Sequence, residues 1–209
     1  MCIRDRPYSH VEDLTALLEY LGIEQANLIG QSFGGGVALD FAIAHPERTL
    51  SLITSGAEVG GSEDPSYTME EQAAVDAFNT ALGEALAKED WQAAAESLLL
   101  LPEFTTAAKH PTAGARLVEM LKDFDWWPMF REDPLVELDP PAVEQLDKVM
   151  APTLVIAGEL SGSFDLAQAD ILVEGITGAQ KVILSGVDHL GHLETPAAFE
   201  KVVMEFLGK

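Results

Sequence analysis

The residue best suited to chemistry in this sequence is Ser32, because glycines flank it at a characteristic spacing. Residues 29–36 read Ile-Gly-Gln-Ser-Phe-Gly-Gly-Gly, which contains the pattern Gly-x-Ser-x-Gly. An apolar, strand-like run precedes the pattern and a helix-like run follows it. A sharp turn from strand to helix would raise the Ser32 hydroxyl above the sheet, where a base can make it a nucleophile.

The backbone around Ser32 would contribute to the same chemistry. Gly30 and Gly34 carry no side chains, so we expect both of them to allow a tight turn. The N–H of Phe33 would point at a carbonyl oxygen that gains negative charge during attack. The alternative interpretation is a strand–turn–helix unit whose glycines only permit close packing.

Strand-like and helix-like segments alternate around this turn. A helix is expected from Ser9, with Glu12 completing a capping box, to Gly22. Strands are expected at residues 26–29, 50–54, 153–157 and 181–184, and further helices at 37–44, at 166–175 and from Thr195 onward. Helices that alternate with strands favour a parallel sheet, so the fold class is α/β.

The residues between the second and third of these strands differ in character. They show helical patterns at 69–88, 91–100 and 112–124, and no convincing strand. We therefore expect a sheet-containing core at 7–60 and 148–209 and a helical cap at 61–147. The apolar residues Trp91, Trp126, Trp127, Met129 and Phe130 would either fill the protein core or line a pocket between cap and sheet.

The composition restricts the partners that the chain can have. Thirty-five acidic residues face twelve basic ones, for a formal net charge of −23, so nucleic acid and anionic membrane surfaces would be repelled. No apolar run approaches the roughly 20 residues of a membrane span, and the first residues do not resemble a secretory signal. A cytoplasmic location is the default expectation. The acidic surface is either ordinary or an adaptation to high salt.

The sequence resembles the α/β-hydrolase superfamily, in its branch with a helical cap, from about Tyr8 to Leu207. Four segments carry the resemblance: residues 30–35, His45-Pro46-Glu47-Arg48, residues 151–159, and Gly186-Val187-Asp188-His189-Leu190 with Glu194 and Pro196 behind it. The resemblance implies that Ser32 is the nucleophile and His189 the base, in the family's order. His192, three residues later, is the alternative base, and His10 and His110 are expected at the surface.

The acid that would orient His189 is left open by the sequence. In the family it normally follows the strand before the last one, and this alignment puts Ser161 at that position. Ser161 can accept a hydrogen bond but cannot stabilise an imidazolium by charge. Asp165 and Glu58 are the two candidate carboxylates, and the third possibility is that the chain has no such acid.

The resemblance also implies that strands are missing before Ser9. A full family member has several strands there, and the loop that supplies the second oxyanion donor. The unpatterned leader at residues 1–6 suggests a truncated reading frame. The strand that enters the Ser32 turn would then be an apolar edge of the sheet, which invites aggregation.

These observations predict a serine hydrolase that cleaves an ester or a related acyl compound through an acyl-enzyme. Its substrate would be a small molecule, and no metal or organic cofactor is implied. A perhydrolase, an acyltransferase and a carbon–carbon bond hydrolase share this machinery. The alternative is a non-catalytic, hydrolase-like binding protein or an inactive fragment. Neither the substrate nor the oligomeric state can be inferred from the sequence.

Overall fold

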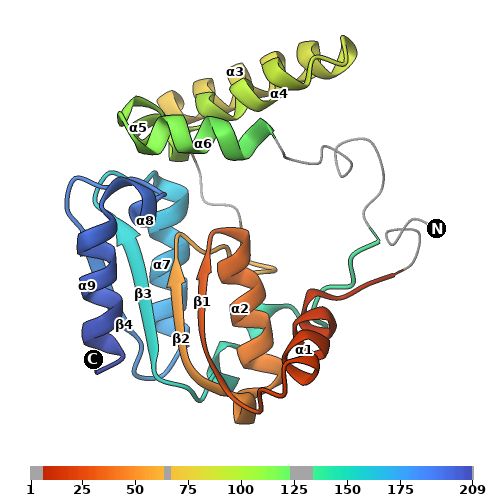
Figure 1. The fold of residues 1–209 in the computed structure, drawn as a ribbon, viewed down its shortest axis with the longest axis vertical. Helices are drawn as coiled ribbons and strands as arrows, with labels where there is room; N and C mark the ends of the chain where they lie inside the picture. Colours follow the sequence, from red (N-terminus) through yellow and green to blue (C-terminus); the bar gives the residue numbers. More distant parts are fainter. Residues whose placement is uncertain (1–6, 64–66, 123–133, 209) are drawn as a thin grey trace. The chain divides into compact units, whose positions relative to one another are not determined.

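A computed structural model describes residues 7–63, 67–122 and 134–208 of the chain (Figure 1). The leader at 1–6 and the aromatic residues Trp126, Trp127 and Phe130 lie outside the described residues, and so does Met129. What the sequence predicts for them stays a prediction.

A four-stranded sheet forms the centre of the fold, in the order β1-β2-β3-β4. Its strands are β1 (Ala26–Gln31), β2 (Thr49–Ser55), β3 (Thr153–Gly158) and β4 (Gln180–Leu184). β1 pairs in parallel with β2, and β2 with β3, which confirms the predicted α/β class. Every residue of β3 is buried, as the continuous apolar run of an inner parallel strand requires. Within the described residues the sheet ends at β1, whose Ile29 side chain is 51% exposed.

The helices largely follow the sequence pattern. They are α1 (His10–Tyr20), α2 (Phe33–Ala44), α3 (Met69–Ala87), α4 (Trp91–Ser97), α5 (Thr105–Lys109), α6 (Ala113–Lys122), α7 (Ser163–Gly175), α8 (Gly191–Glu194) and α9 (Pro196–Phe206). The short helices α5 and α8 were not predicted, because five and four residues are too few to show a period. No helix in the described part of the chain is long and apolar enough to cross a bilayer.

The helix α1 begins without the predicted capping box. The Ser9 side chain makes no capping hydrogen bond, and the N–H of Asp13 instead donates to the Ser9 backbone carbonyl at 2.9 Å. A complete capping box occurs at α3, where Thr68 and Glu71 bond each other's backbone N–H. Gly22, at a φ of +67°, lies just beyond the end of α1, as predicted.

The helix α2 is apolar apart from Asp40 and packs against β1 and β2. Its buried residues are Gly35, Ala38, Leu39, Phe41, Ala42 and Ile43. The helix ends at Ala44, and the ring of His45 then lies 3.1 Å from the Thr15 hydroxyl, between Nε2 and Oγ1. His45 is therefore the residue that follows the last turn of α2.

The described residues belong to two compact units. One comprises the described parts of Met1–Glu63, Trp126–Ile156 and Gln168–Val182, and the other those of Asp64–Asp125, Ala157–Ala167 and Ile183–Lys209. The second unit joins the helices α3 to α6 with the start of α7 and with the C-terminal segment. The predicted assignment of 61–147 as a cap domain stays a prediction.

Candidate active site

Ser32 has a backbone conformation that few side-chain-bearing residues adopt. It sits between β1 and α2 at a φ of 53° and a ψ of −126°. Backbone hydrogen bonds hold it there: the Ser32 N–H donates to the Ser55 carbonyl at 2.8 Å, and the Ser32 carbonyl accepts from the Gly35 N–H at 2.8 Å and from the Gly36 N–H at 3.2 Å. Such strain persists only where surrounding structure enforces it, and it is common at catalytic turns. The local geometry therefore agrees with the nucleophile elbow that the sequence predicts.

The two glycines of the Gly-x-Ser-x-Gly pattern have different roles. A Cβ on Gly30 would collide with the backbone carbonyl of Gly34. A Cβ on Gly34 would meet no atom within 4 Å beyond its own helix. The expectation that both glycines make the turn possible holds for Gly30 and is wrong for Gly34. Gly35 is the second crowded position, because its Cβ would lie 2.5 Å from the Ala57 Cβ.

Phe33 begins α2, so its N–H belongs to the first turn of the helix, where backbone donors lack helical acceptors. Its side chain is 59% exposed, and its ring meets the His10 ring edge-on at 5.1 Å between centroids. The sequence predicts that His10 is a surface residue, whereas the structure shows it half-buried. His110, also expected at the surface, is half-buried too, and its Nδ1 accepts a hydrogen bond from the Ala113 N–H at 3.2 Å.

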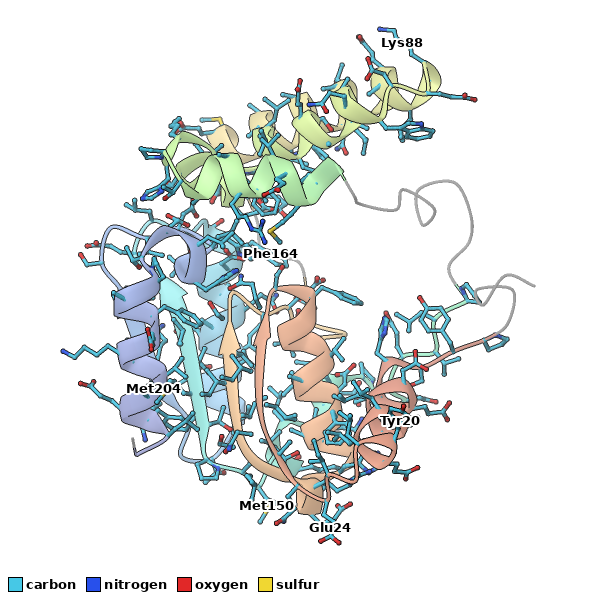
Figure 2. The ribbon with its side chains drawn as sticks, in the orientation of Figure 1. Tyr20, Glu24, Lys88, Met150, Phe164 and Met204 are labelled. Carbon is cyan, nitrogen blue, oxygen red and sulfur yellow. The ribbon has the colours of Figure 1, made fainter. Side chains whose placement is uncertain are left out.

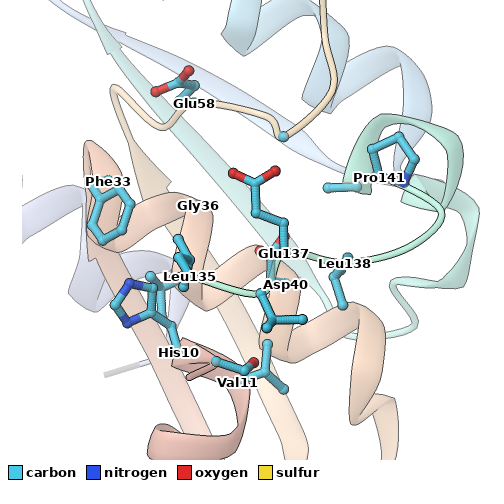
Figure 3. Close-up of a pocket in the computed structure, with 15 residues that line it drawn as sticks. His10, Val11, Phe33, Gly36, Asp40, Glu58, Leu135, Glu137, Leu138 and Pro141 are labelled. Carbon is cyan, nitrogen blue, oxygen red and sulfur yellow. The ribbon is translucent and has the colours of Figure 1, made fainter. Parts of the chain in front are cut away.

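A cavity of about 150 Å³ lies beside α2 in the first unit (Figure 3). Phe33 and His10 line one part of it, and three carboxylates, Asp40, Glu58 and Glu137, also line it. Burial, and then the charge of Glu137, raise the pKa of Asp40 to about 6. Glu58 is thus part of this acidic cavity wall in the first unit.

The second unit contains His189 and the carboxylate that binds it. The Nδ1 of His189 lies 2.7 Å from the Oδ2 of Asp165. Both side chains are buried, at 5% and 8% exposure. The chain therefore has an acid for the predicted base, and the possibility that it has none is wrong. Of the two candidate carboxylates, Asp165 is the one that bonds His189.

Burial and nearby carboxylates act on His189 in opposite directions. Burial is the largest single cause and lowers the pKa of the imidazole, but the hydrogen bond and charge of Asp165 and the charges of Glu103 and Asp188 together raise it more. The net effect is a raised pKa. A histidine whose pKa is raised accepts a proton more readily than a free histidine does.

The start of α7 differs from the sequence prediction and bears on why Asp165, and not residue 161, bonds His189. The sequence pattern predicts that this helix begins at Leu166, whereas it begins at Ser163. Asp165 therefore lies inside the first helical turn, where acidic residues are common, and not in the preceding loop. Ser161 is buried, and its N–H donates to the Gly158 carbonyl at 3.3 Å.

Glu71 of α3 holds the first turn of α7 in place. Its Oε1 accepts from the Ser163 N–H at 2.7 Å, and its Oε2 from the Ser163 hydroxyl at 2.8 Å. The Ser163 N–H, followed by the Thr68 bonds and the Ser163 hydroxyl, lowers the pKa of Glu71 to about 2. Next to it, Phe164, labelled in Figure 2, stacks on Tyr67 at 6.3 Å between ring centroids. Sequence reasoning missed the contact between Glu71 and Ser163, because no local pattern links residues 92 positions apart.

Other side chains enclose the imidazole of His189. The Phe104 ring meets it edge-on at 5.8 Å between centroids. Burial raises the pKa of the neighbouring Glu103 carboxyl, and burial also raises the pKa of Asp188 to about 6. Burial, and then the charge of His189, lower the pKa of His192. Of the two histidines His189 and His192, it is thus His189 that the Asp165 carboxylate bonds.

No group of three or more His, Cys, Asp or Glu side chains is arranged to hold a metal ion within the described residues. A cofactor-free reaction stays a prediction.

Comparison with known proteins gives a family. A family model described as the alpha/beta hydrolase fold matches residues 5–196. The 2-hydroxymuconate semialdehyde hydrolase of Pseudomonas sp. (strain CF600) is 29% identical over 214 residues, which cover 95% of this chain and 68% of that protein. A 2-hydroxy-6-oxononadienedioate/2-hydroxy-6-oxononatrienedioate hydrolase of Cupriavidus pinatubonensis is 30% identical over 203 residues, 93% of this chain and 66% of that protein.

A solved structure has the same architecture. The crystal structure of a hydrolase from Pseudomonas aeruginosa PA01 aligns with 97% of this chain and 73% of its own, at a TM-score of 0.71 and 25% identity.

Gly30 and Gly34 provide a matched pair for testing the elbow. We expect Gly30→Ala to lower the free energy of unfolding by about 1–3 kcal/mol, because its methyl group meets backbone that cannot move aside. Gly34→Ala is expected to be neutral or to stabilise by up to about 1 kcal/mol, since alanine favours the helix. Urea unfolding of both variants measures this, and equal effects would contradict the description of the turn.

The Asp165–His189 pair predicts a pH-dependent stability. A raised folded pKa stabilises the protein fully below the unfolded value of about 6.5, and this contribution is lost as the pH rises through the folded pKa. Asp165→Asn should therefore lower the free energy of unfolding by about 1.5–3 kcal/mol at pH 6 and by less at pH 9. Asp170→Asn, an exposed change on the same helix, is the control and should show no such trend. An Asp165→Asn deficit that grows with pH would refute the assignment.

Proposed function

Because the chain belongs to the α/β-hydrolase family and is an enzyme of the hydrolase class, we propose that it is a serine hydrolase of small acyl compounds. Ser32 is the nucleophile, His189 the general base and acid, and Asp165 the carboxylate that orients His189. The backbone N–H of Phe33 is an oxyanion donor. The substrate is an ester or a related acyl compound.

The observation that carries this proposal is the buried hydrogen bond between His189 and Asp165. When Nδ1–H donates to the carboxylate, the basic lone pair of the imidazole is on Nε2. A buried carboxylate in this place also stabilises the imidazolium that forms when the ring takes a proton. Buried ion pairs in proteins can also serve stability alone. This pair includes His189, the histidine in the segment at 186–190 that resembles α/β hydrolases.

The proposed reaction follows from these groups. His189 Nε2 takes the proton of the Ser32 hydroxyl while Oγ bonds to the carbonyl carbon, and the carbonyl oxygen becomes negative. The Phe33 N–H stabilises this oxyanion. The imidazolium then protonates the leaving group, which departs and leaves Ser32 acylated. A water molecule repeats the sequence and releases the carboxylic acid.

A second candidate reaction is the hydrolysis of a carbon–carbon bond. The two relatives described above are named for hydrolases of 2-hydroxymuconate semialdehyde and of 2-hydroxy-6-oxo dienedioates or trienedioates. In such a substrate a serine attacks the ketone or aldehyde carbonyl, and the leaving group is a stabilised carbanion that takes the proton. The same Ser32, His189 and Asp165 would serve this reaction.

The catalytic assignment predicts a pattern of rates on p-nitrophenyl esters. We expect Asp165→Asn to lower kcat about 10⁴-fold, as for the corresponding change in a serine protease. Ser32→Ala and His189→Gln are expected to lower it at least as far. The controls are Ser185→Ala, an exposed serine, and His192→Gln, the alternative base, and both should retain kcat within about three-fold. If His192→Gln were the inactive histidine variant, the assignment of the base would be wrong.

The choice of substrate is tested by comparing two reactions of the same preparation. Loss of the conjugated absorbance of 2-hydroxymuconate semialdehyde reports carbon–carbon cleavage, and release of p-nitrophenol reports ester cleavage. An ester kcat/KM that exceeds the carbon–carbon value by about ten-fold or more supports the ester proposal. The reverse ratio would replace it with the second candidate.

A further inference from the structure

A second buried carboxylate lies next to His189. Glu194 ends α8, five residues after His189, and is 5% exposed. Burying a charged carboxylate is costly unless strong hydrogen bonds replace its water. The position of Glu194 therefore has to be explained by the bonds that it makes.

The two oxygens of Glu194 accept hydrogen bonds from the residues on either side of His189. Oε2 accepts from the Asp188 N–H at 3.1 Å, and Oε1 accepts from the Leu190 N–H at 3.0 Å. One carboxylate thus fixes two backbone N–H groups that flank the imidazole-bearing residue. Charge-assisted bonds of this kind are stronger than neutral ones.

The segment needs such support because it is neither helix nor strand. Residues 185–190 connect β4 to α8 without regular structure. On its N-terminal side the segment lies against the end of β3: the Leu160 N–H donates to the Val187 carbonyl at 2.8 Å, and a Cβ on Gly158 would collide with the Asp188 carbonyl. On its C-terminal side Glu194 is the side chain that holds the backbone.

We propose that Glu194 is a positioning residue, which fixes the backbone on both sides of His189 so that Nδ1 stays on Asp165. This inference rests on the proposed function for its effect on rate, but its effect on the imidazole is independent of activity. A backbone error of about 1 Å at a catalytic group can lower a rate about 10²-fold. Glu194 acts through the backbone and touches no reacting atom.

Two variants separate position from charge. Glu194→Gln keeps the size but turns an NH₂ group toward one of the two backbone N–H groups. Glu194→Asp keeps the charge but is one methylene shorter, so it cannot hold both N–H groups. If Glu194 acts by position, both variants misplace the imidazole; if it acts by charge, Glu194→Asp behaves like the parent.

Glu159→Gln is the matched control. Its Oε2 accepts from the Ser185 hydroxyl at 2.6 Å and from the Gly186 N–H at 2.8 Å, so it also binds backbone of the same segment. It does not bond the residues adjoining His189, and it is exposed. This control removes one negative charge beside the same segment while leaving the Glu194 bonds intact.

The experiment measures the pKa of His189 by NMR titration of the imidazole, together with kcat and KM on a p-nitrophenyl ester. We expect both Glu194 variants to lower the pKa of His189, because the ring no longer faces Asp165, and to lower kcat about 10–100-fold with KM within about three-fold. Glu159→Gln should change neither quantity appreciably.

The outcomes are distinct. An unchanged His189 pKa in folded Glu194→Asp overturns the proposal, whatever the Gln variant does. Should Glu194→Gln fail to fold, Glu194→Asp alone decides. If the parent and Ser32→Ala hydrolyse the ester equally slowly, the proposed function fails, while the NMR titration still tests the positioning role.

Discussion

The buried hydrogen bond between Asp165 and His189 is the interaction in the second unit on which the proposed active site depends. An imidazole and a carboxylate at 5% and 8% exposure are stable only where the protein aligns them accurately. Asp165 depends on the first turn of α7, and His189 depends on an irregular segment after β4. Neither segment is rigid by itself, so each needs partners from elsewhere in the chain.

Carboxylates supply those partners. Glu71 holds the N–H and hydroxyl of Ser163 at the start of α7, and Glu194 holds the N–H groups beside His189. Glu159 binds the same segment at Gly186. In a chain of net charge −23, some of the acidic residues thus act as backbone acceptors and are not merely solvated. The strained backbone of Ser32 is held in a comparable way in the first unit, by its bond to the Ser55 carbonyl.

Much of this organisation could be predicted from local patterns in the sequence. The alternation of apolar runs predicts all four strands within a few residues, and the Gly-x-Ser-x-Gly pattern predicts the turn from strand to helix at Ser32. The resemblance to α/β hydrolases aligned Ser161 with the acid, whereas Asp165 is the carboxylate that bonds His189. The apolar pattern also placed the start of α7 three residues too late, so the sequence did not show that Asp165 occupies its first turn.

Long-range contacts account for what the sequence could not predict. No spacing rule relates Glu71 to Ser163. The sequence places Glu194 in a family-like segment but does not indicate what the side chain does. Gly34 looks equivalent to Gly30 in the pattern, yet a Cβ on Gly30 would collide with backbone whereas a Cβ on Gly34 would meet nothing within 4 Å beyond its own helix. Such differences depend on three-dimensional packing, which one sequence does not contain.

The central claim is that Ser32 is an activated nucleophile, and covalent labelling with a fluorophosphonate tests it most directly. Mass mapping of the labelled peptide should place the adduct on Ser32 of the folded protein, with no adduct in Ser32→Ala and much slower labelling in His189→Gln. Folded protein that stays unlabelled, or that carries the adduct on another residue, would contradict the claim.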